Sequence, residues 1–153
     1  MPVDHQALSE RYATALAGDD LAVIDEVFTE DFVDEYPQSG EVIRGRNNLR
    51  SMMEHRPGRS SDTGPDLASV RARAGDEHRV IAPLFTVVRV QGRGDAGTTT
   101  LRARYPDGSW WWIVVVYELR DGRIARSTTF FAPQFEAPEW RAPFVERRVA
   151  PGT

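Results

Sequence analysis

The sequence predicts a single α+β domain in which helices come first and a mostly antiparallel sheet follows. Three observations support this fold class. Apolar residues in the first third of the chain recur at spacings of three and four, the pattern of a helix with one buried face. Beyond residue 66, apolar stretches of strand length alternate with turn signals such as Asp121-Gly122. The 153 residues contain no internal repeat and suit one domain over 1–153, with a core over about 5–132 and an ordered tail over about 133–148.

Three helices are expected in the N-terminal third. The first ends at Gly18, a residue type that favours the position just after a helix. Its apolar face consists of Leu8, Tyr12, Ala15 and Leu16. The acidic residues 19–20 then provide an N-cap and negative charge for a second helix over residues 21–28. The third helix follows Gly45, and its apolar positions are Leu49, Met52 and Met53.

The rest of the chain is expected to be strands and loops. An extended segment that begins at Phe32 is punctuated near Pro37, and residues 41–44 are its continuation or its partner. Residues 56–66 are rich in Gly, Pro and Ser and are expected to form a loop. Further strands are expected over residues 67–74, 80–90, 98–105, 109–119 and 124–131. The tail is expected to be packed by Phe135, Trp140 and Phe144.

The composition limits the chemistry that the chain can perform. Its 19 basic residues are all Arg, and it has no Cys. Schiff-base catalysis, a phosphate-binding lysine, thiolate catalysis and cysteine-held metal clusters are therefore excluded. The three histidines, His5, His55 and His78, are far apart and lack metal-ligand spacing, so we expect neither a metal nor a cofactor.

Charge and hydropathy narrow the range of partners. The net charge is −4 and the Arg residues are interleaved with acids, so no nucleic-acid partner is expected. The longest apolar run, residues 110–117, is far shorter than the roughly 20 residues that span a bilayer, so no membrane partner is expected. The polar N-terminus and the absence of Cys favour a cytoplasmic location.

Residues 92–97 match the glycine spacing of the dinucleotide-binding fingerprint. That motif requires a helix directly after it, because the helix N-terminus holds the pyrophosphate. Here Thr98-Thr99-Thr100-Leu101 follows, which has the character of a strand. We therefore interpret these glycines as part of a hairpin loop.

The run from Trp110 to Tyr117 is apolar at every position. Because alternate side chains of a strand point to opposite faces, both faces of this strand require cover. One face can pack on the helices, and a second subunit would cover the other, which predicts a homodimer through the sheet. The alternative is an intramolecular core in which the C-terminal tail covers the second face.

The acidic segment over residues 30–37 carries the main candidates for chemistry. In a strand, Phe32, Asp34 and Tyr36 share one face. If Phe32 faces the interior, a carboxylate and a phenol are buried with it, and such pairs are where acid–base chemistry is found. The alternative is a solvated acidic edge of the sheet.

Several residues keep a characteristic order along the chain. They are Arg11-Tyr12, residues 18–21, Phe28, Asp31, Tyr36-Pro37, Gly45 and Arg46, and the hairpin over residues 117–124. In this order they resemble the nuclear-transport-factor-2-like superfamily, in particular its SnoaL-like and ketosteroid-isomerase-like members, over about residues 5–132. The tail is similar to that of a bacterial subgroup. The resemblance implies a cone-shaped α+β barrel in which three N-terminal helices pack on a strongly curved, mostly antiparallel sheet around a pocket, and usually a homodimer.

Compared position by position, the chain keeps one of the three catalytic groups of ketosteroid isomerase. Tyr12 matches the tyrosine that donates to the oxyanion. Tyr36 stands where the isomerase has its aspartate base, before a proline, and Val115 where a protonated aspartate is the second donor. A phenol with a pKa near ~10 is a poor base at neutral pH, so steroid isomerisation by that mechanism is not expected. The histidine of SnoaL-type cyclases has no clear counterpart in His55 or His78.

Two functions from different classes fit these residues. In the first, the protein binds an apolar small molecule and acts as an isomerase, cyclase, dehydratase or hydrolase without a cofactor. Tyr12 and Tyr36 would donate hydrogen bonds and Asp34 would move a proton, so these three are the expected catalytic residues. The expected pocket wall consists of Met53, Phe85, Trp111, Val115 and Phe130. In the second, the same fold is a non-catalytic dimeric ligand-binding or scaffold protein, in which the two tyrosines satisfy each other.

Overall fold

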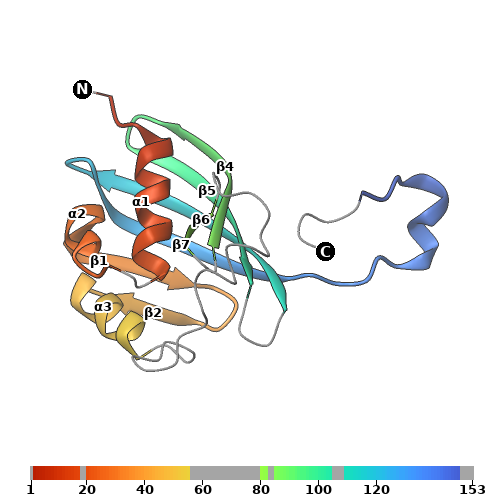
Figure 1. The fold of residues 1–153 in the computed structure, drawn as a ribbon, viewed down its shortest axis with the longest axis horizontal. Helices are drawn as coiled ribbons and strands as arrows, with labels where there is room; N and C mark the ends of the chain where they lie inside the picture. The colour runs from red at the N-terminus through yellow and green to blue at the C-terminus, as the bar shows by residue number, and fades with distance from the viewer. Residues whose placement is uncertain (1, 18–19, 56–79, 83–84, 105–108, 149–153) are drawn as a thin grey trace.

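The structure is a computed structural model that describes residues 2–17, 20–55, 80–82, 85–104 and 109–148 (Figure 1). Several sequence-based expectations fall outside these ranges. They concern the end of the first helix at Gly18, the loop over 56–66, the strand over 67–74 and His78.

Three helices occupy the N-terminal third, as predicted. They are α1 (His5–Ala17), α2 (Val23–Val27) and α3 (Arg46–Glu54). Asp4 caps α1, because its carboxylate accepts a hydrogen bond from the Ala7 amide at 3.0 Å. Helix α2 is shorter than expected. It ends where Phe28 takes an extended conformation and joins the sheet beside Ile124, so tertiary pairing overrides the helical pattern there.

Seven strands of the described chain form one sheet, in the order β2-β1-β7-β6-β5-β4-β3. They are β1 (Phe28–Tyr36), β2 (Glu41–Arg44), β3 (Val80–Ala82), β4 (Phe85–Arg93), β5 (Ala96–Arg104), β6 (Trp110–Arg120) and β7 (Arg123–Pro133). Neighbouring strands are antiparallel except β1 and β7, which run parallel. The fold class is therefore α+β with a curled, mostly antiparallel sheet, as the sequence predicts.

The expectation of one long strand over residues 80–90 is wrong. The structure has two strands there, β3 and β4, which pair antiparallel with Val80 opposite Thr86. Pro83 stands between them in the sequence. A proline interrupts a strand because it has no N–H to donate to the ladder.

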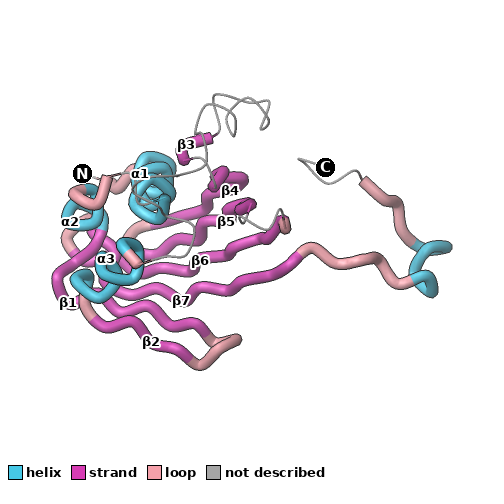
Figure 2. The backbone as a smooth tube through the Cα atoms, turned by 60° about the horizontal axis from the view of Figure 1, so that its bottom comes forward, coloured by secondary structure: helices cyan, strands magenta, loops and turns pink. Residues whose placement is uncertain are grey.

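The three helices all lie on one face of the sheet, which we call the inner face (Figure 2). The opposite, outer face carries no helix of the described chain. Side chains of β6 show the difference between the two faces. Ile113, Val115 and Tyr117 on the inner face are at most 2% exposed, whereas Val116 on the outer face is 46% exposed. The core between helices and sheet is built mainly by aromatic and aliphatic side chains such as Tyr12, Ile24, Phe28, Phe32, Leu101 and Ile124.

The hairpin between β6 and β7 has the predicted turn. Asp121 and Gly122 both have positive φ angles, 52° and 76°, which is the geometry of a two-residue type I′ turn. This turn twists in the same sense as its flanking strands, so it fixes the register of the two longest strands. Their register brings the inner-face residues Val115 and Thr129 opposite each other.

The glycine-rich segment over 92–97 is the hairpin between β4 and β5, as interpreted from the sequence. Two of its glycines make room for side chains from elsewhere. A Cβ at Gly92 would clash with the His5 ring, and a Cβ at Gly97 would clash with the Tyr117 ring. The two rings are joined by a hydrogen bond of 2.8 Å between His5 Nδ1 and Tyr117 Oη. The glycines therefore allow the start of α1 to be tied to the sheet.

Replacing Gly97 with Ala is expected to lower the free energy of unfolding by about 1–3 kcal/mol, the usual effect of overpacking a filled core. The added methyl group would displace the Tyr117 ring and with it the contact to His5. Urea unfolding followed by circular dichroism measures the loss. Ala96→Ser, at an exposed position of the same strand, is the control and should change stability by no more than about 0.5 kcal/mol. Equal effects of both variants would contradict this account of Gly97.

The C-terminal tail is not packed on its own domain, contrary to expectation. It continues from β7 and extends away from the body of the fold (Figure 1). Phe135, Trp140 and Phe144 are 77%, 73% and 82% exposed, and a short 3-10 turn (Glu139–Phe144) is its only helical element among the described residues. The aromatic residues predict that the tail has an apolar contact, but nothing in the sequence says on which surface.

No described helix is both long enough and apolar enough to cross a bilayer.

Candidate functional site

The three residues predicted to be catalytic come together on the inner face of the sheet. Tyr12 projects from α1, whereas Asp34 and Tyr36 alternate with outward-facing residues along β1. Tyr12 is 3% and Asp34 2% exposed, and Tyr36 is partly buried. The predicted strand alternation is therefore confirmed, and Phe32 is fully buried on the same face. The alternative of a solvated acidic edge is wrong for Asp34.

Asp34 is a buried carboxyl group whose polar partners are hydroxyls. The Thr129 hydroxyl donates to it, with Oγ1 at 2.9 Å from Oδ1 and 3.2 Å from Oδ2. No described basic side chain forms an ion pair with it. Burial raises the pKa of Asp34 above its ordinary value, and the neighbouring hydroxyls of Ser127 and Thr129 offset part of that rise. Asp34 is thus able to hold a proton at a higher pH than a solvated aspartate.

Tyr12 and Tyr36 complete this group. Burial raises the pKa of Tyr12 well above its ordinary value, and the nearby charges of Asp34 and Tyr36 raise it further. Tyr12 therefore stays protonated and acts as a hydrogen-bond donor rather than a base. The Tyr36 ring is held edge-on against Phe131, with ring centroids 5.0 Å apart. The three side chains together offer one group that can exchange a proton and two phenols that can donate hydrogen bonds.

Of the five expected pocket-wall residues, three lie on the inner side of the fold. Met53 of α3 and Val115 of β6 are buried, 6% and 1% exposed. Trp111 of β6 is half-buried, and its Nε1 donates to the Ser109 hydroxyl at 2.9 Å. Phe85 lies in β4, with its backbone opposite Ala103, but its side chain is outside the described part of the structure.

The expectation for Phe130 is wrong. Phe130 is 40% exposed and lies on the outer face, one residue beyond the inner-face Thr129. Phe131 takes the inner position instead and packs on Tyr36 and the core. The error is one of strand parity, since two adjacent phenylalanines always point to opposite faces and the sequence does not say which is inside.

Sequence reasoning missed Ser127 and Thr129, which place hydroxyls around Asp34. Both are buried on the inner face of β7. Thr129 hydrogen-bonds to Asp34, and Ser127 lies opposite Asp34 in the sheet, because β7 pairs in parallel with β1. The two strands are about ninety residues apart in the sequence, as the separation of 95 between Thr129 and Asp34 shows. The run of three hydroxyl residues over 127–129 is the sequence signal for this contact, and it does not identify the partner strand.

The histidines lie away from this group. His55 follows α3, is exposed, and donates from Nδ1 to the carbonyl of Ser51 at 2.7 Å. His5 bridges Tyr117 and the carbonyl of Gly94. Among the described residues there is no group of three potential ligands for a metal ion.

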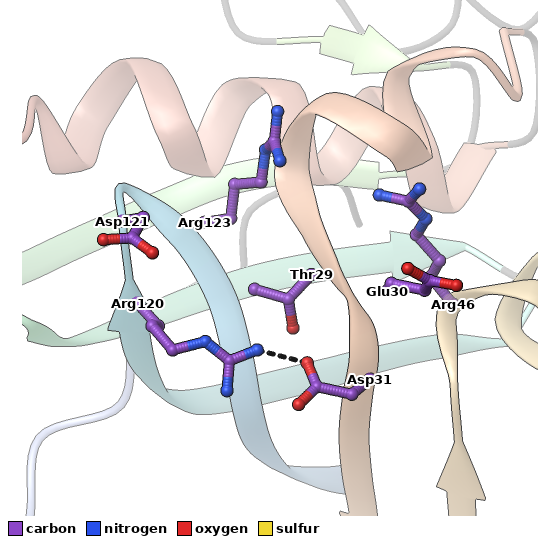
Figure 3. A pocket seen from close by; sticks show the side chains of 7 residues that line it. All are labelled: Thr29, Glu30, Asp31, Arg46, Arg120, Asp121 and Arg123. Atoms are coloured by element: carbon purple, nitrogen blue, oxygen red, sulfur yellow. Dashed lines mark hydrogen bonds and ion pairs between the residues drawn. The ribbon is translucent and has the colours of Figure 1, made fainter.

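A shallow pocket on the surface lies apart from the inner-face group (Figure 3). Its lining combines three arginines with three acids and one threonine: Thr29, Glu30, Asp31, Arg46, Arg120, Asp121 and Arg123. Two of the arginines form ion pairs, Arg120 with Asp31 and Arg46 with Asp25. Because these charges compensate one another, the pocket offers no net attraction for an ionic ligand.

The family profile of the SnoaL-like domain matches residues 9–127, which is most of the chain. The chain belongs to the SnoaL-like domain family. The matched region contains Tyr12, Asp34, Tyr36 and Ser127, and it ends two residues before Thr129. It ends before the tail of this SnoaL-like protein. No curated protein sequence matches the chain.

Solved structures agree with this assignment. An NTF-2-like protein of unknown function from Burkholderia xenovorans LB400 is 30% identical, with 94% of each chain covered and a TM-score of 0.69. A candidate ketosteroid isomerase from Kribbella flavida DSM 17836 is 24% identical over 95% of this chain and 90% of that one, with a TM-score of 0.70. An LEH-like epoxide hydrolase from M. tuberculosis is 20% identical over 82% and 80%, with a TM-score of 0.57. The last two likenesses show the fold alone, which is the NTF2-like cone.

Proposed function

We propose that this SnoaL-like protein binds an apolar small molecule that carries a carbonyl or hydroxyl group, and that it transforms this molecule by acid–base chemistry without a cofactor. One observation carries the proposal: the Asp34 carboxyl group is buried without a counter-cation among the described residues, beside two tyrosines on the inner face. A buried carboxyl group without a counter-charge is costly to folding. Such groups are found where proton transfer requires them.

The arrangement suits a reaction in which a proton moves between two atoms of one substrate. Asp34 in its ionised form would accept a proton from a carbon or oxygen of the substrate and return it to another atom. Tyr12 would donate a hydrogen bond to the oxygen on which negative charge develops, because its raised pKa keeps its own proton in place. Tyr36 would donate a second hydrogen bond. An isomerisation or cyclisation of this kind needs no co-reactant, and a dehydration would release the hydroxyl group as water.

The fold relatives agree with this range of reactions but do not select one. The proteins of similar fold include one described as a ketosteroid isomerase and one described as an epoxide hydrolase. By the resemblance to ketosteroid isomerase, Tyr12 would stand at the position of its oxyanion donor and Tyr36 at that of its base. Asp34 lies two residues earlier on the same face of β1 and is the group that would assume the role of the base.

A second function, ligand binding without catalysis, is favoured by the contacts of Asp34 itself. The Thr129 hydroxyl donates its one proton to the carboxylate, with Oγ1 at 2.9 and 3.2 Å from the two oxygens, and Asp34 is only 2% exposed. In that case Asp34 holds β1 to β7 and the tyrosines only orient a ligand. The two functions predict different effects of removing the Asp34 charge on the conversion of a bound ligand.

The test begins with a thermal-shift screen of apolar carbonyl and hydroxyl compounds against the full chain, since a ligand of the folded state raises its melting temperature. Each hit is then incubated with the wild type and with Asp34→Asn, and conversion is followed by mass spectrometry. The proposed enzyme predicts that Asp34→Asn keeps the thermal shift and loses about 10²–10⁴-fold in turnover. Glu35→Gln, the exposed neighbour on the same strand, is the control and should keep both. Binding without conversion by the wild type would instead select the non-catalytic function.

A further inference from the structure

The outer face of the sheet exposes apolar side chains in the middle of its longest strands. Val88, Val116 and Phe130 are 47%, 46% and 40% exposed, on β4, β6 and β7. Trp112 and Val114 lie between them on β6 and are half-buried. Single exposed apolar residues are ordinary, but a group of them across neighbouring strands marks an interaction surface. No described element of the chain covers it (Figure 2).

The outer face also holds a buried cation that stacks on two tryptophans. Arg102 of β5 is 3% exposed, and its guanidinium lies against the rings of Trp110 and Trp112, 4.9 and 4.8 Å from their centroids. Nη2 donates to Gln134 Oε1 at 3.0 Å. Nε and Nη1 are buried and have no hydrogen-bond partner among the described residues. The guanidinium is therefore held mainly by its stacking on the two tryptophans and by its hydrogen bond to Gln134.

The C-terminal arm, defined here as residues 134–148, also exposes apolar side chains. It begins beside this cation, where the Gln134 amide donates to the Trp110 carbonyl at 3.1 Å. Beyond that point no described residue of the rest of the domain hydrogen-bonds to it, and the arm extends into solvent (Figure 1). It combines three exposed aromatic side chains with charges of both signs, which are Glu136, Glu139 and Glu146 and Arg141, Arg147 and Arg148. The arm thus carries exposed apolar side chains which, like those of the outer face, no described residue of the chain covers.

We propose that the arm of one copy of the chain packs on the outer face of a second copy. Its aromatic residues cover the apolar side chains there, beside the Arg102 guanidinium and the two tryptophans on which it stacks. The fifteen residues of the arm span up to about 50 Å when extended, enough to cross a sheet of this size. A twofold arrangement makes the exchange reciprocal, so that each copy gives one arm and receives one. This exchange goes beyond the function proposed above and does not depend on it.

Cross-linking tests where the arm lies. Because the chain contains no cysteine of its own, only the introduced cysteines can react. One sample carries Ala137→Cys, in the arm, and a second, size-tagged sample carries Ala132→Cys, on the outer face next to Trp112. After mixing and addition of a short bismaleimide, we expect a product that contains both chains. Val42→Cys, exposed on edge strand β2, replaces Ala132→Cys in the control and should give no such product. Cross-linking of residues 132 and 137 only within a single doubly substituted chain would overturn the exchange.

Sedimentation equilibrium of the full chain tests the energetics. The wild type is expected to be dimeric at micromolar concentration. Trp140→Ala with Phe144→Ala should raise the dimer dissociation constant by about tenfold or more, as the loss of exposed aromatic anchors does. Val116→Ala with Phe130→Ala, on the outer face that receives the arm, should weaken the dimer as well. Val42→Ala should leave the constant unchanged. A monomeric wild type, or a dimer that the arm variants do not weaken, would contradict the proposal.

Discussion

Replacing Phe28 with Ala is expected to destabilise the domain by about 3–5 kcal/mol, the usual range for removing a buried phenylalanine ring. Phe28 is fully buried at the start of β1. Its ring packs on Tyr12 and on Phe32, with centroids 5.6 and 4.5 Å away. The substitution would leave a cavity directly beneath α1, because all three rings belong to the same layer between helix and sheet. Urea unfolding monitored by circular dichroism measures the loss.

The matched control is Phe28→Leu, which keeps an apolar side chain of similar reach. It should cost less than about 1.5 kcal/mol, because volume-conserving changes in a core are tolerated best. If Phe28→Ala cost no more than Phe28→Leu, the aromatic layer would not be the support that positions Tyr12 on the inner face.

The second large effect concerns the pH dependence of stability. Burial raises the pKa of Asp34 in the folded state, so the folded protein binds a proton more tightly than the unfolded chain does. The free energy of unfolding should therefore fall as pH rises from the unfolded-state value near ~3.9 through the raised folded-state value. Asp34→Asn removes this group. The variant should gain stability relative to the wild type across that window, with a melting temperature ~2–4 °C higher for each kcal/mol gained.

Asp31→Asn is the matched control, because it lies on the same strand and its shift has the opposite sign. The hydrogen bond from Arg120 lowers the pKa of Asp31 in the folded state. Ionised Asp31 therefore adds to the free energy of unfolding above its unfolded-state pKa, and this stabilisation disappears as the pH falls through its pKa in the folded state. Relative to the wild type, Asp31→Asn should lose stability at neutral pH and match it in acid. If both variants changed stability in the same direction at neutral pH, the burial assigned to Asp34 would be wrong.

Local patterns in the sequence were sufficient where the structure depends on neighbours along the chain. The turn at Asp121-Gly122 follows from its need for positive φ angles. The shared face of Phe32, Asp34 and Tyr36 follows from strand alternation alone. The third helix begins directly after Gly45, whose φ of 84° is disfavoured for other residues.

What the sequence could not predict depends on contacts between distant segments. Phe130 and Phe131 are equivalent until the pairing of β7 with β6 fixes which of them is inside. Thr129 becomes a partner of Asp34 only because β1 and β7 run in parallel. The tail is expected to pack on its own domain because its aromatic residues need cover, but in the structure these residues stay exposed and the tail extends away from the domain.

The central claim is that the inner face holds a protonatable carboxyl group between two tyrosines. It is tested most directly by carbon-13 NMR of the aspartate side-chain carboxyl groups across pH 3–8, with Asp34→Asn used to assign the signal. The account predicts that Asp34 titrates above the ordinary aspartate value near ~3.9, while Asp31 titrates below it. An Asp34 signal that titrates at or below the ordinary value would show that this carboxyl group is not buried as described, and the proposed acid–base role would fall with it.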